Sequence, residues 1–320
     1  MNILFHLHAY PNTNLSGAEM MAHRIAKFLQ SKGHNIKVIN GSCNNNSVFE
    51  GIEVIGFNLN KNDHDLWLWA DVVVTHLVNT HYCLNQARKY NKKLIHLIHN
   101  SFSDHILKVR ENANYLVYNS DYVRKILGYN HPYTICIPPV NYRDYEVSNK
   151  GSYITLVNLN ENKGGRILIE IAKRLPEYKF LAIEGGYYDQ IKDELVKNIK
   201  YLHPQVDMKK IYNKTKLLLM PSEYESWGQV AIEAIASGVP VLSSEAQGLK
   251  EALGNATISI DRKNIDAWVK YIKVVMEDSA VYSKLQELSI LRAKELDPIP
   301  YLERLNTFFE QVKNVKLWKQ

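Results

Sequence analysis

Short apolar runs alternate with segments of helical spacing along most of this chain. Apolar runs in the first half predict strands at 2–8, 36–40, 71–77, 93–98, 115–118 and 134–137. The segments near 17–32, 78–90 and 120–128 have the apolar spacing of helices. Because strands and helices alternate, this half predicts a doubly wound parallel sheet.

A stretch near 138–151 contains two consecutive prolines and many polar residues, and it interrupts this alternation. A second alternation then begins, with predicted strands at 153–157, 178–184, 216–220, 239–243 and 256–260. A last helix is expected from about 301 to 314. At 320 residues the chain is long enough for two domains with separate cores. We therefore expect one domain at 1–147 and another at 148–299.

Composition narrows the class of protein. Hydrophobic residues make up 46% of the chain and charged residues 22%, which is ordinary for a globular protein. The first residues lack the basic flank of a secretion signal, and no uncharged apolar stretch reaches the roughly 20 residues that span a bilayer. Three isolated cysteines indicate neither a disulfide framework nor a zinc site. These features predict a cytoplasmic protein without a transmembrane segment.

The net charge is +6, and the basic residues lean towards the first half of the chain. An excess of basic residues in one half of the chain suits a peripheral contact with an anionic membrane surface or with nucleic acid. Solvated lysines at helix ends explain it equally well, so charge alone does not choose between these partners.

The most informative segment, 221–234, holds two carboxylates, Glu225 and Glu233, separated by seven residues. Glu225 falls in a loop after an apolar run, and Glu233 falls inside a helix that begins near Gly228. The N-terminus of a helix has unpaired amide donors and the positive end of the helix dipole, so it suits a phosphate. One carboxylate can then bind hydroxyls on one side of that phosphate, and the other a diol on the opposite side. A sugar–diphosphate–ribose ligand has this layout.

This segment resembles the E-x7-E signature of retaining nucleotide-sugar glycosyltransferases with the GT-B fold, which are similar to glycosyltransferase family 4. The residues of these motifs most resemble those of the short bacterial and bacteriophage members of the family. The resemblance implies two Rossmann-like, doubly wound parallel-sheet domains that face each other across a cleft, with a final helix of about 300–320 packed back on the first. It also implies transfer of a hexosyl unit from a UDP-glucose-like donor, with no metal and no other cofactor required.

The resemblance also assigns roles to matching residues. In the first domain, Ser16 and Gly17 stand where the family has a small-residue loop near the donor diphosphate, and His99 stands where a strand-end His contacts the donor sugar. In the second domain, Lys163 is expected to support the leaving diphosphate. Asn158 stands in place of the family's Arg, which removes one expected positive charge.

The remaining expected contacts lie in two further loops. Glu184 and Gly185 resemble the loop that lies against the nucleoside. Glu225 is expected to hold sugar hydroxyls and Glu233 the ribose. His99, Lys163 and Glu225 are thus the expected catalytic residues, and the other donor contacts after the first Glu are Ser226, Trp227, Gly228 and Gln229.

Histidines form a second candidate feature, since all but one of the 12 precede residue 132. His6, His8 and His76 are expected at the same end of the sheet as His99, which suggests a metal site. However, no carboxylate recurs at ligand spacing, and the resembling family acts without an essential metal. We therefore expect no metal, and a role for the imidazoles near an acceptor hydroxyl or an anionic acceptor.

Other functions remain open at this point. The sequence does not choose among three acceptor classes: a lipid-linked or cell-surface glycan, a protein side chain, and hydroxymethylated phage DNA. A GT-B epimerase would need another set of carboxylates, and a phosphorylase a cofactor Lys motif that we do not find. Because Asn158 replaces the family's Arg, a non-catalytic sugar-nucleotide binding module remains an alternative. A Rossmann dehydrogenase is disfavoured, because no G-x-G-x-x-G follows the first strand.

Overall fold

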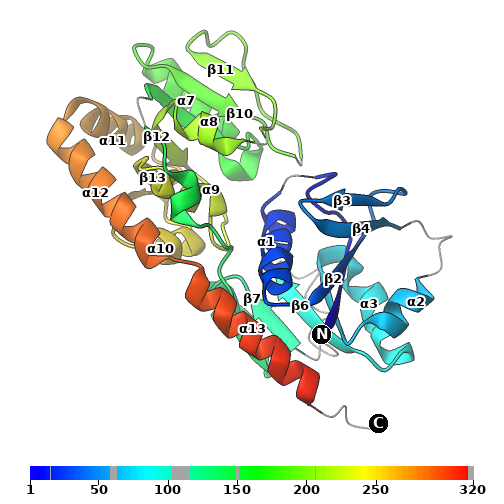
Figure 1. The fold of residues 1–320 in the computed structure, drawn as a ribbon. Coiled ribbons are helices and arrows are strands. Elements are labelled where there is room, and N and C mark those ends of the chain that lie inside the picture. The colour runs from blue at the N-terminus through cyan, green and yellow to red at the C-terminus, as the bar shows by residue number, and fades with distance from the viewer. Residues whose placement is uncertain are drawn as a thin grey trace. The chain divides into compact units, whose positions relative to one another are not determined.

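The computed structural model describes residues 1–14, 16–57, 63–102, 115–148, 151–186, 188–205 and 207–315. The chain forms two compact units: Met1–Pro139 together with Pro298–Gln320, and Val140–Asp297 (Figure 1). The second unit begins before residue 148, where we placed the boundary. The reason is the short helix η2 (Tyr142–Tyr145), whose Tyr145 ring lies 6.3 Å from the Tyr212 ring of the second unit.

The first unit is built on an eight-stranded sheet in the described part of the chain, with the order β3-β4-β2-β1-β5-β6-β7-β8. The strands are β1 (Asn2–Leu7), β2 (Asn35–Asn40), β3 (Ser47–Phe49), β4 (Ile52–Gly56), β5 (Val72–His76), β6 (Lys93–Ile98), β7 (Tyr115–Tyr118) and β8 (Tyr133–Ile135). All neighbouring pairs are parallel except β3 with β4.

The edge hairpin β3–β4 was missed by the apolar pattern. Val48 in β3 is 72% exposed, so the strand has little buried surface to mark it. Its turn residues, Glu50 and Gly51, have φ of 46° and 79°, which is the backbone that tight hairpin turns require. This hairpin adds one antiparallel strand to the edge of an otherwise parallel sheet.

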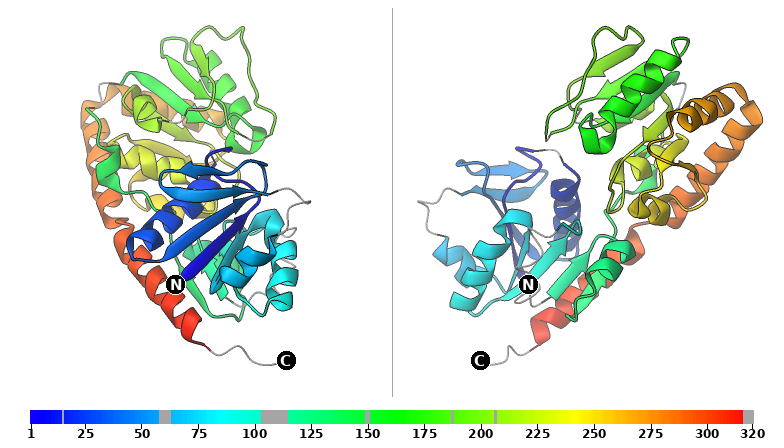
Figure 2. Two further views of the ribbon diagram at one scale, coloured as in Figure 1. Left: turned by 45° about the vertical axis from the view of Figure 1, so that its right-hand side comes forward. Right: turned by 180° about the vertical axis from the view of Figure 1, so that it is seen from behind.

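Five α-helices accompany this sheet among the described residues: α1 (Gly17–Ser31), α2 (His64–Trp69), α3 (Thr80–Lys89), α6 (Asp121–Leu127) and α13 (Ile299–Asn314), together with the short 3-10 helix η1 (Leu77–Asn79). Helix α13, red in Figures 1 and 2, buries Leu302, Leu305 and Phe309 in the core formed with β1 and α1. Their spacing of three to four residues places them on one helix face. Residues 316–320, which we included in this helix, lie outside the described residues.

The second unit contains a six-stranded parallel sheet, again among the described residues, with the order β11-β10-β9-β12-β13-β14. The strands are β9 (Tyr153–Val157), β10 (Phe180–Ile183), β11 (Ile199–Leu202), β12 (Thr215–Met220), β13 (Val241–Ser244) and β14 (Thr257–Ile260). The accompanying helices are η3 (Glu161–Lys163), α7 (Gly165–Arg174), α8 (Met208–Tyr212), α9 (Gln229–Ala236), α10 (Gln247–Leu253), α11 (Ile265–Glu277) and α12 (Ser279–Glu295). Only the short edge strand β11 was not predicted.

Helix packing closes the core of this unit. The amphipathic helix α7 turns Leu168, Ile171 and Ala172 into the core, where they meet Trp268 and Ile272 of α11. Burying an aliphatic side chain of this size contributes about 1.5–3 kcal/mol. No helix in the described parts of the chain combines the length and apolarity that crossing a bilayer requires.

The strand order reverses once in each sheet, and these points locate the candidate sites. The reversal lies between β1 and β5 in the first unit and between β9 and β12 in the second. In open α/β sheets, ligands bind beyond the carboxyl ends of the strands at such a switch point. The loops after these four strands are therefore the places to look for chemistry.

Candidate functional site

Two oppositely charged side chains meet at the switch point of the second sheet. Lys163 ends η3, which follows β9, and Glu225 lies in the loop after β12. The Lys163 Nζ atom is 2.5 Å from Glu225 Oε1, and the two side chains are 25% and 11% exposed. Partial burial reduces solvent screening, so this pair is held more firmly than a surface ion pair.

A serine hydroxyl from the loop after β12 holds the Glu225 carboxylate, and a second serine at the end of β13 holds that loop. Ser222 Oγ donates a hydrogen bond of 3.0 Å to Glu225 Oε1. Ser244, the last residue of β13, donates in turn to the Ser222 carbonyl oxygen at 2.6 Å. The carboxylate is thus tied to the loops after β9 and β12 and to the end of β13.

Two glycines let the neighbouring helices approach the backbone of the Glu225 loop. A Cβ on Gly248 of α10 would lie 2.2 Å from the Glu225 carbonyl oxygen, so no larger residue fits there without displacing the loop. Gly228 has φ of +95°, the left-handed backbone that favours glycine, and it turns the chain into α9. The first turn of α9 then follows the Glu225 loop directly, with the free amides and positive dipole end of a helix start.

Glu233 occupies the buried side of α9 and is 5% exposed. Its Oε2 accepts a hydrogen bond of 3.0 Å from the Tyr212 hydroxyl, and its Oε1 accepts one of 2.8 Å from Gln229 Nε2. Trp227, also predicted to contact the donor, is buried at 3% exposure, and Ser226 is half-buried. These residues share one loop and one helix, although Glu233 bonds to a different set of side chains from Glu225.

Asn158 follows β9 and adopts a left-handed backbone with φ of 71°. Asn tolerates this conformation better than most residues, and its Oδ1 accepts from Gln190 Nε2 at 3.3 Å. Gln190 Oε1 accepts the Gly185 amide at 2.7 Å, so the loops after β9 and β10 are joined. The Glu184 carboxylate accepts hydrogen bonds from Lys192 and His203, and these bonds, with that from Lys192 the stronger influence, lower the pKa of its carboxyl group. The structure gives Asn158 a loop-bracing role.

Arg262 is a site residue that sequence reasoning missed. It follows β14, and its guanidinium donates to the Pro221 carbonyl at 2.9 Å and to the Glu161 carbonyl at 2.6 Å. It therefore clamps together the two loops that carry Lys163 and Glu225. Its position just after a parallel strand was the available signal. Arg166, three residues after Lys163, is 68% exposed and pairs with Glu161, so it does not replace the positive charge that the family's Arg would supply at position 158.

The residues predicted in the first unit gather at the other switch point. Ser16 precedes α1, and its Oγ donates to Glu19 Oε2, while Gly17 opens the helix and is exposed. His99 follows β6, and its Nε2 lies 2.9 Å from His76 Nδ1. Burial and the nearby His8 lower the pKa of His99 to about 3.

A carboxylate joins these imidazoles, which the sequence spacing did not indicate. His8, Glu19 and His76 each place one ligand-type atom within 4.8 Å of the other two. Burial, followed by the neighbouring His99, His8 and His96, lowers the pKa of His76 well below its usual value. His6 takes no part in this group, because it bonds to Asn79 at 3.0 Å and lies 3.4 Å from Asp63.

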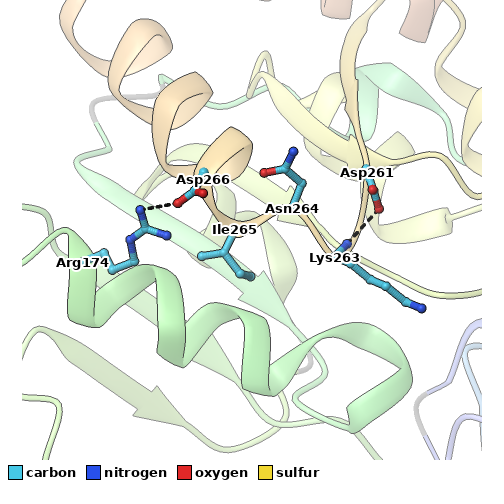
Figure 3. A pocket seen from close by; sticks show the side chains of 6 residues that line it. All are labelled: Arg174, Asp261, Lys263, Asn264, Ile265 and Asp266. Carbon is cyan, nitrogen blue, oxygen red and sulfur yellow. Dashed lines mark hydrogen bonds and ion pairs between the residues drawn. The ribbon is translucent and has the colours of Figure 1, made fainter.

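A separate cavity of about 420 Å³ lies on the second unit, beside the start of α11 (Figure 3). Its lining includes Arg174 and Asp266, which form an ion pair of 2.6 Å, and Lys263, whose amide bonds to Asp261. None of the residues predicted from sequence lines this cavity. Arg174 and Asp266 neutralise each other, and the cavity does not contain the residues at the two switch points, so we do not place the functional site there.

Comparison with known proteins identifies the class to which the second unit is similar. Residues 144–292 match the model of the family Glycosyl transferases group 1. O-antigen chain mannosyltransferase B of Escherichia coli is 26% identical over 159 residues, which is 45% of this chain and 41% of that protein. D-inositol 3-phosphate glycosyltransferase of Mycobacterium marinum is 31% identical over 97 residues, or 28% and 21% of the two chains. The chain thus spans less than half the length of these curated relatives.

Solved structures resemble the chain over nearly its whole length. Anabaena HepE in complex with UDP and glucose has a TM-score of 0.83 at 15% identity, covering 97% of this chain and 99% of that one. Sucrose-phosphate synthase from Thermosynechococcus elongatus has a TM-score of 0.82 at 16% identity, covering 98% and 99%. The prediction of two Rossmann-like parallel-sheet domains, as in GT-B glycosyltransferases, is confirmed.

Proposed function

We propose that the protein is a retaining glycosyltransferase that moves a hexosyl unit from a UDP-glucose-like donor to a hydroxyl acceptor. The observation that carries the proposal is the Lys163–Glu225 pair at the switch point of the second sheet, next to the start of α9. A cation and a carboxylate side by side suit a ligand in which a diphosphate adjoins sugar hydroxyls. The likeness of residues 144–292 to Glycosyl transferases group 1 supports this choice.

Each charged group then has a distinct role. The bond between the anomeric carbon and the β-phosphate oxygen breaks, and negative charge collects on that oxygen. Lys163 and the first amides of α9 stabilise this charge, which is greater in the transition state than in the bound donor. Glu225 holds sugar hydroxyls and Glu233 the ribose. The Lys163–Glu225 bond must open or be shared when the diphosphate binds.

Retention follows if the acceptor attacks the face from which the diphosphate leaves. The acceptor oxygen bonds to the anomeric carbon, and its proton passes to the departing β-phosphate oxygen. In this proposal no metal or other cofactor takes part, because Lys163 and the helix amides supply the positive field. The acceptor is a carbohydrate or polyol hydroxyl, as the names of the mannosyltransferase and inositol-phosphate relatives suggest.

Donor hydrolysis without an acceptor tests the proposal. The wild-type chain should release UDP slowly from UDP-glucose, and Glu225→Ala should slow the release about tenfold to a hundredfold. Tight donor binding with no turnover would instead favour a non-catalytic binding module, and a changed sugar still attached to UDP would favour an epimerase. The anomeric configuration of the product, read by NMR with a productive acceptor, tests retention.

A panel of acceptors completes the assignment. Lipid-linked oligosaccharide, free polyols, protein and hydroxymethylated duplex DNA should be compared by mass spectrometry of the products. We expect glycosylated polyol or oligosaccharide. Glycosylated DNA as the main product would overturn the acceptor class while leaving the donor chemistry intact, and its rate should then fall steeply with salt.

A further inference from the structure

Three ligand-type side chains from separate elements converge at the switch point of the first sheet. His8 follows β1, Glu19 lies in the first turn of α1, and His76 ends β5. The His8 Nε2 and Glu19 Oε1 atoms are 3.3 Å apart. Two ligands at about 2.1 Å from a tetrahedral zinc ion are separated by about 3.4 Å. This pair is therefore already at ligand spacing, and His76 completes a group within 4.8 Å.

The His76 ring points to a ligand independently of that spacing. It is fully buried at 0% exposure, and its Nε2 has no hydrogen-bond partner among the described residues. Its other nitrogen, Nδ1, is occupied by the His99 Nε2 at 2.9 Å. A buried polar atom without a partner is costly to the fold. A metal ion bound at Nε2 would remove that cost.

Neighbouring residues orient two of the three ligands. Ser16 Oγ donates to Glu19 Oε2, while Oε1 of the same carboxylate faces His8. His99 holds the far nitrogen of His76 and is itself anchored, because Asn119 Nδ2 donates to its carbonyl oxygen at 2.9 Å. Metal sites in proteins commonly have such outer partners, which fix the ring and the carboxylate for binding.

We propose that the first unit binds one divalent transition-metal ion, by its ligand chemistry zinc, through His8, Glu19 and His76. Two imidazoles and one carboxylate are a familiar zinc set with a fourth position for water. The His8 side chain is 23% exposed, which gives the ion a path from solvent. This site lies within one unit and does not depend on the proposed glycosyl transfer.

Direct metal binding tests the proposal. The full chain, carrying Cys43→Ser to remove its half-buried thiol, is stripped with a chelator and titrated with Zn²⁺ against a chromophoric competitor. We expect one ion per chain. His8→Gln and Glu19→Gln should each weaken binding at least about a hundredfold, since removing a ligand costs no less than removing an outer partner. His81→Gln, an exposed histidine on α3, is the matched control and should bind within about twofold of the parent.

Two outcomes would overturn the site. The first is the absence of a one-to-one complex in the stripped parent protein. The second is a His8→Gln variant that binds Zn²⁺ as well as His81→Gln does. Thermal unfolding by circular dichroism accompanies each variant, and the partly exposed His8 keeps the test valid even if Glu19→Gln does not fold. Titration with Mn²⁺ and Fe²⁺ checks the choice of metal: tighter binding of either than of Zn²⁺ would contradict it.

Discussion

The two units place different chemistry at corresponding points of similar sheets. In the second unit, the switch point between β9 and β12 carries the Lys163–Glu225 ion pair. In the first unit, the switch point between β1 and β5 carries His8, Glu19 and His76. A fixed cation beside a helix start suits a phosphate, whereas imidazoles with one carboxylate suit a metal ion. The fold provides the position, and the loop residues decide what is bound there.

The two sites also differ in how they are held. Around Glu225 the loops are joined through backbone atoms: Arg262 binds two carbonyl oxygens, and Gly248 lies against a third. In the first unit, side chains hold one another, as in the His76–His99 contact. We therefore expect substitutions in the second unit to act through loop position, and those in the first through loss of a single ligand.

The largest expected effect comes from Lys163→Met. Removing a preorganised positive group from a developing charge costs about a hundredfold to a thousandfold in kcat. Steady-state release of UDP from UDP-glucose measures it. Arg166→Met, which removes an exposed cation three residues away, is the control and should keep nearly full activity. Equal losses in the two variants would remove the distinction between the site and the surrounding surface.

Substitutions of Glu225 and Glu233 should have different effects on UDP binding, because the two carboxylates bind different parts of the donor. Glu225→Gln and Glu233→Gln should each lower kcat/KM about tenfold to a hundredfold, the value of a charged hydrogen bond. Calorimetry with UDP alone then distinguishes them. Glu233→Gln should weaken UDP binding, while Glu225→Gln should not, because its loss leaves Lys163 free for the diphosphate. Weaker UDP binding in Glu225→Gln would show that our division of roles is incorrect.

A smaller effect is expected from Arg262→Met. Without its guanidinium, the loops carrying Lys163 and Glu225 lose two hydrogen bonds, and kcat/KM should fall about tenfold. Arg262→Lys should recover part of this loss. Arg174→Met, which breaks the ion pair with Asp266 beside the separate cavity, is the matched control. A loss as large in Arg174→Met as in Arg262→Met would contradict the clamp.

The smallest effect should come from metal removal. If the metal site of the first unit takes no part in donor cleavage, treatment with a chelator should change the UDP-glucose hydrolysis rate by less than about twofold. The same treatment should empty the site detected by Zn²⁺ titration. A large loss of hydrolysis that added Zn²⁺ restores would show that the metal site takes part in donor cleavage. It would contradict the separation of the two sites drawn above.

Sequence patterns predicted the interior strands because buried parallel strands are short continuous apolar runs. Strands at the edges of the two sheets were harder to predict from sequence. The hairpin of β3 and β4 exposes Val48, and β11 has only four residues, so neither leaves a strong apolar signal. The second unit begins at Val140, before the predicted boundary, because the tilted contact between the Tyr145 and Tyr212 rings that places η2 in this unit is not visible in sequence.

For the site, motifs supplied residues but not their partners. Lys163 and Glu225 were each selected, yet their direct bond depends on two loops far apart in the chain. Arg262 acts on backbone carbonyls, which carry no residue signature. Glu19 lies three residues after Ser16, but nothing in the sequence connects it to His8, because only the fold brings the carboxylate and the imidazole together.

A crystal structure of the protein with UDP tests the central claim most directly. We predict that the diphosphate contacts Lys163 Nζ and the first amides of α9, with the ribose hydroxyls at Glu233. A diphosphate bound elsewhere, for example at Arg174 in the separate cavity, or a ribose distant from Glu233, would contradict the account.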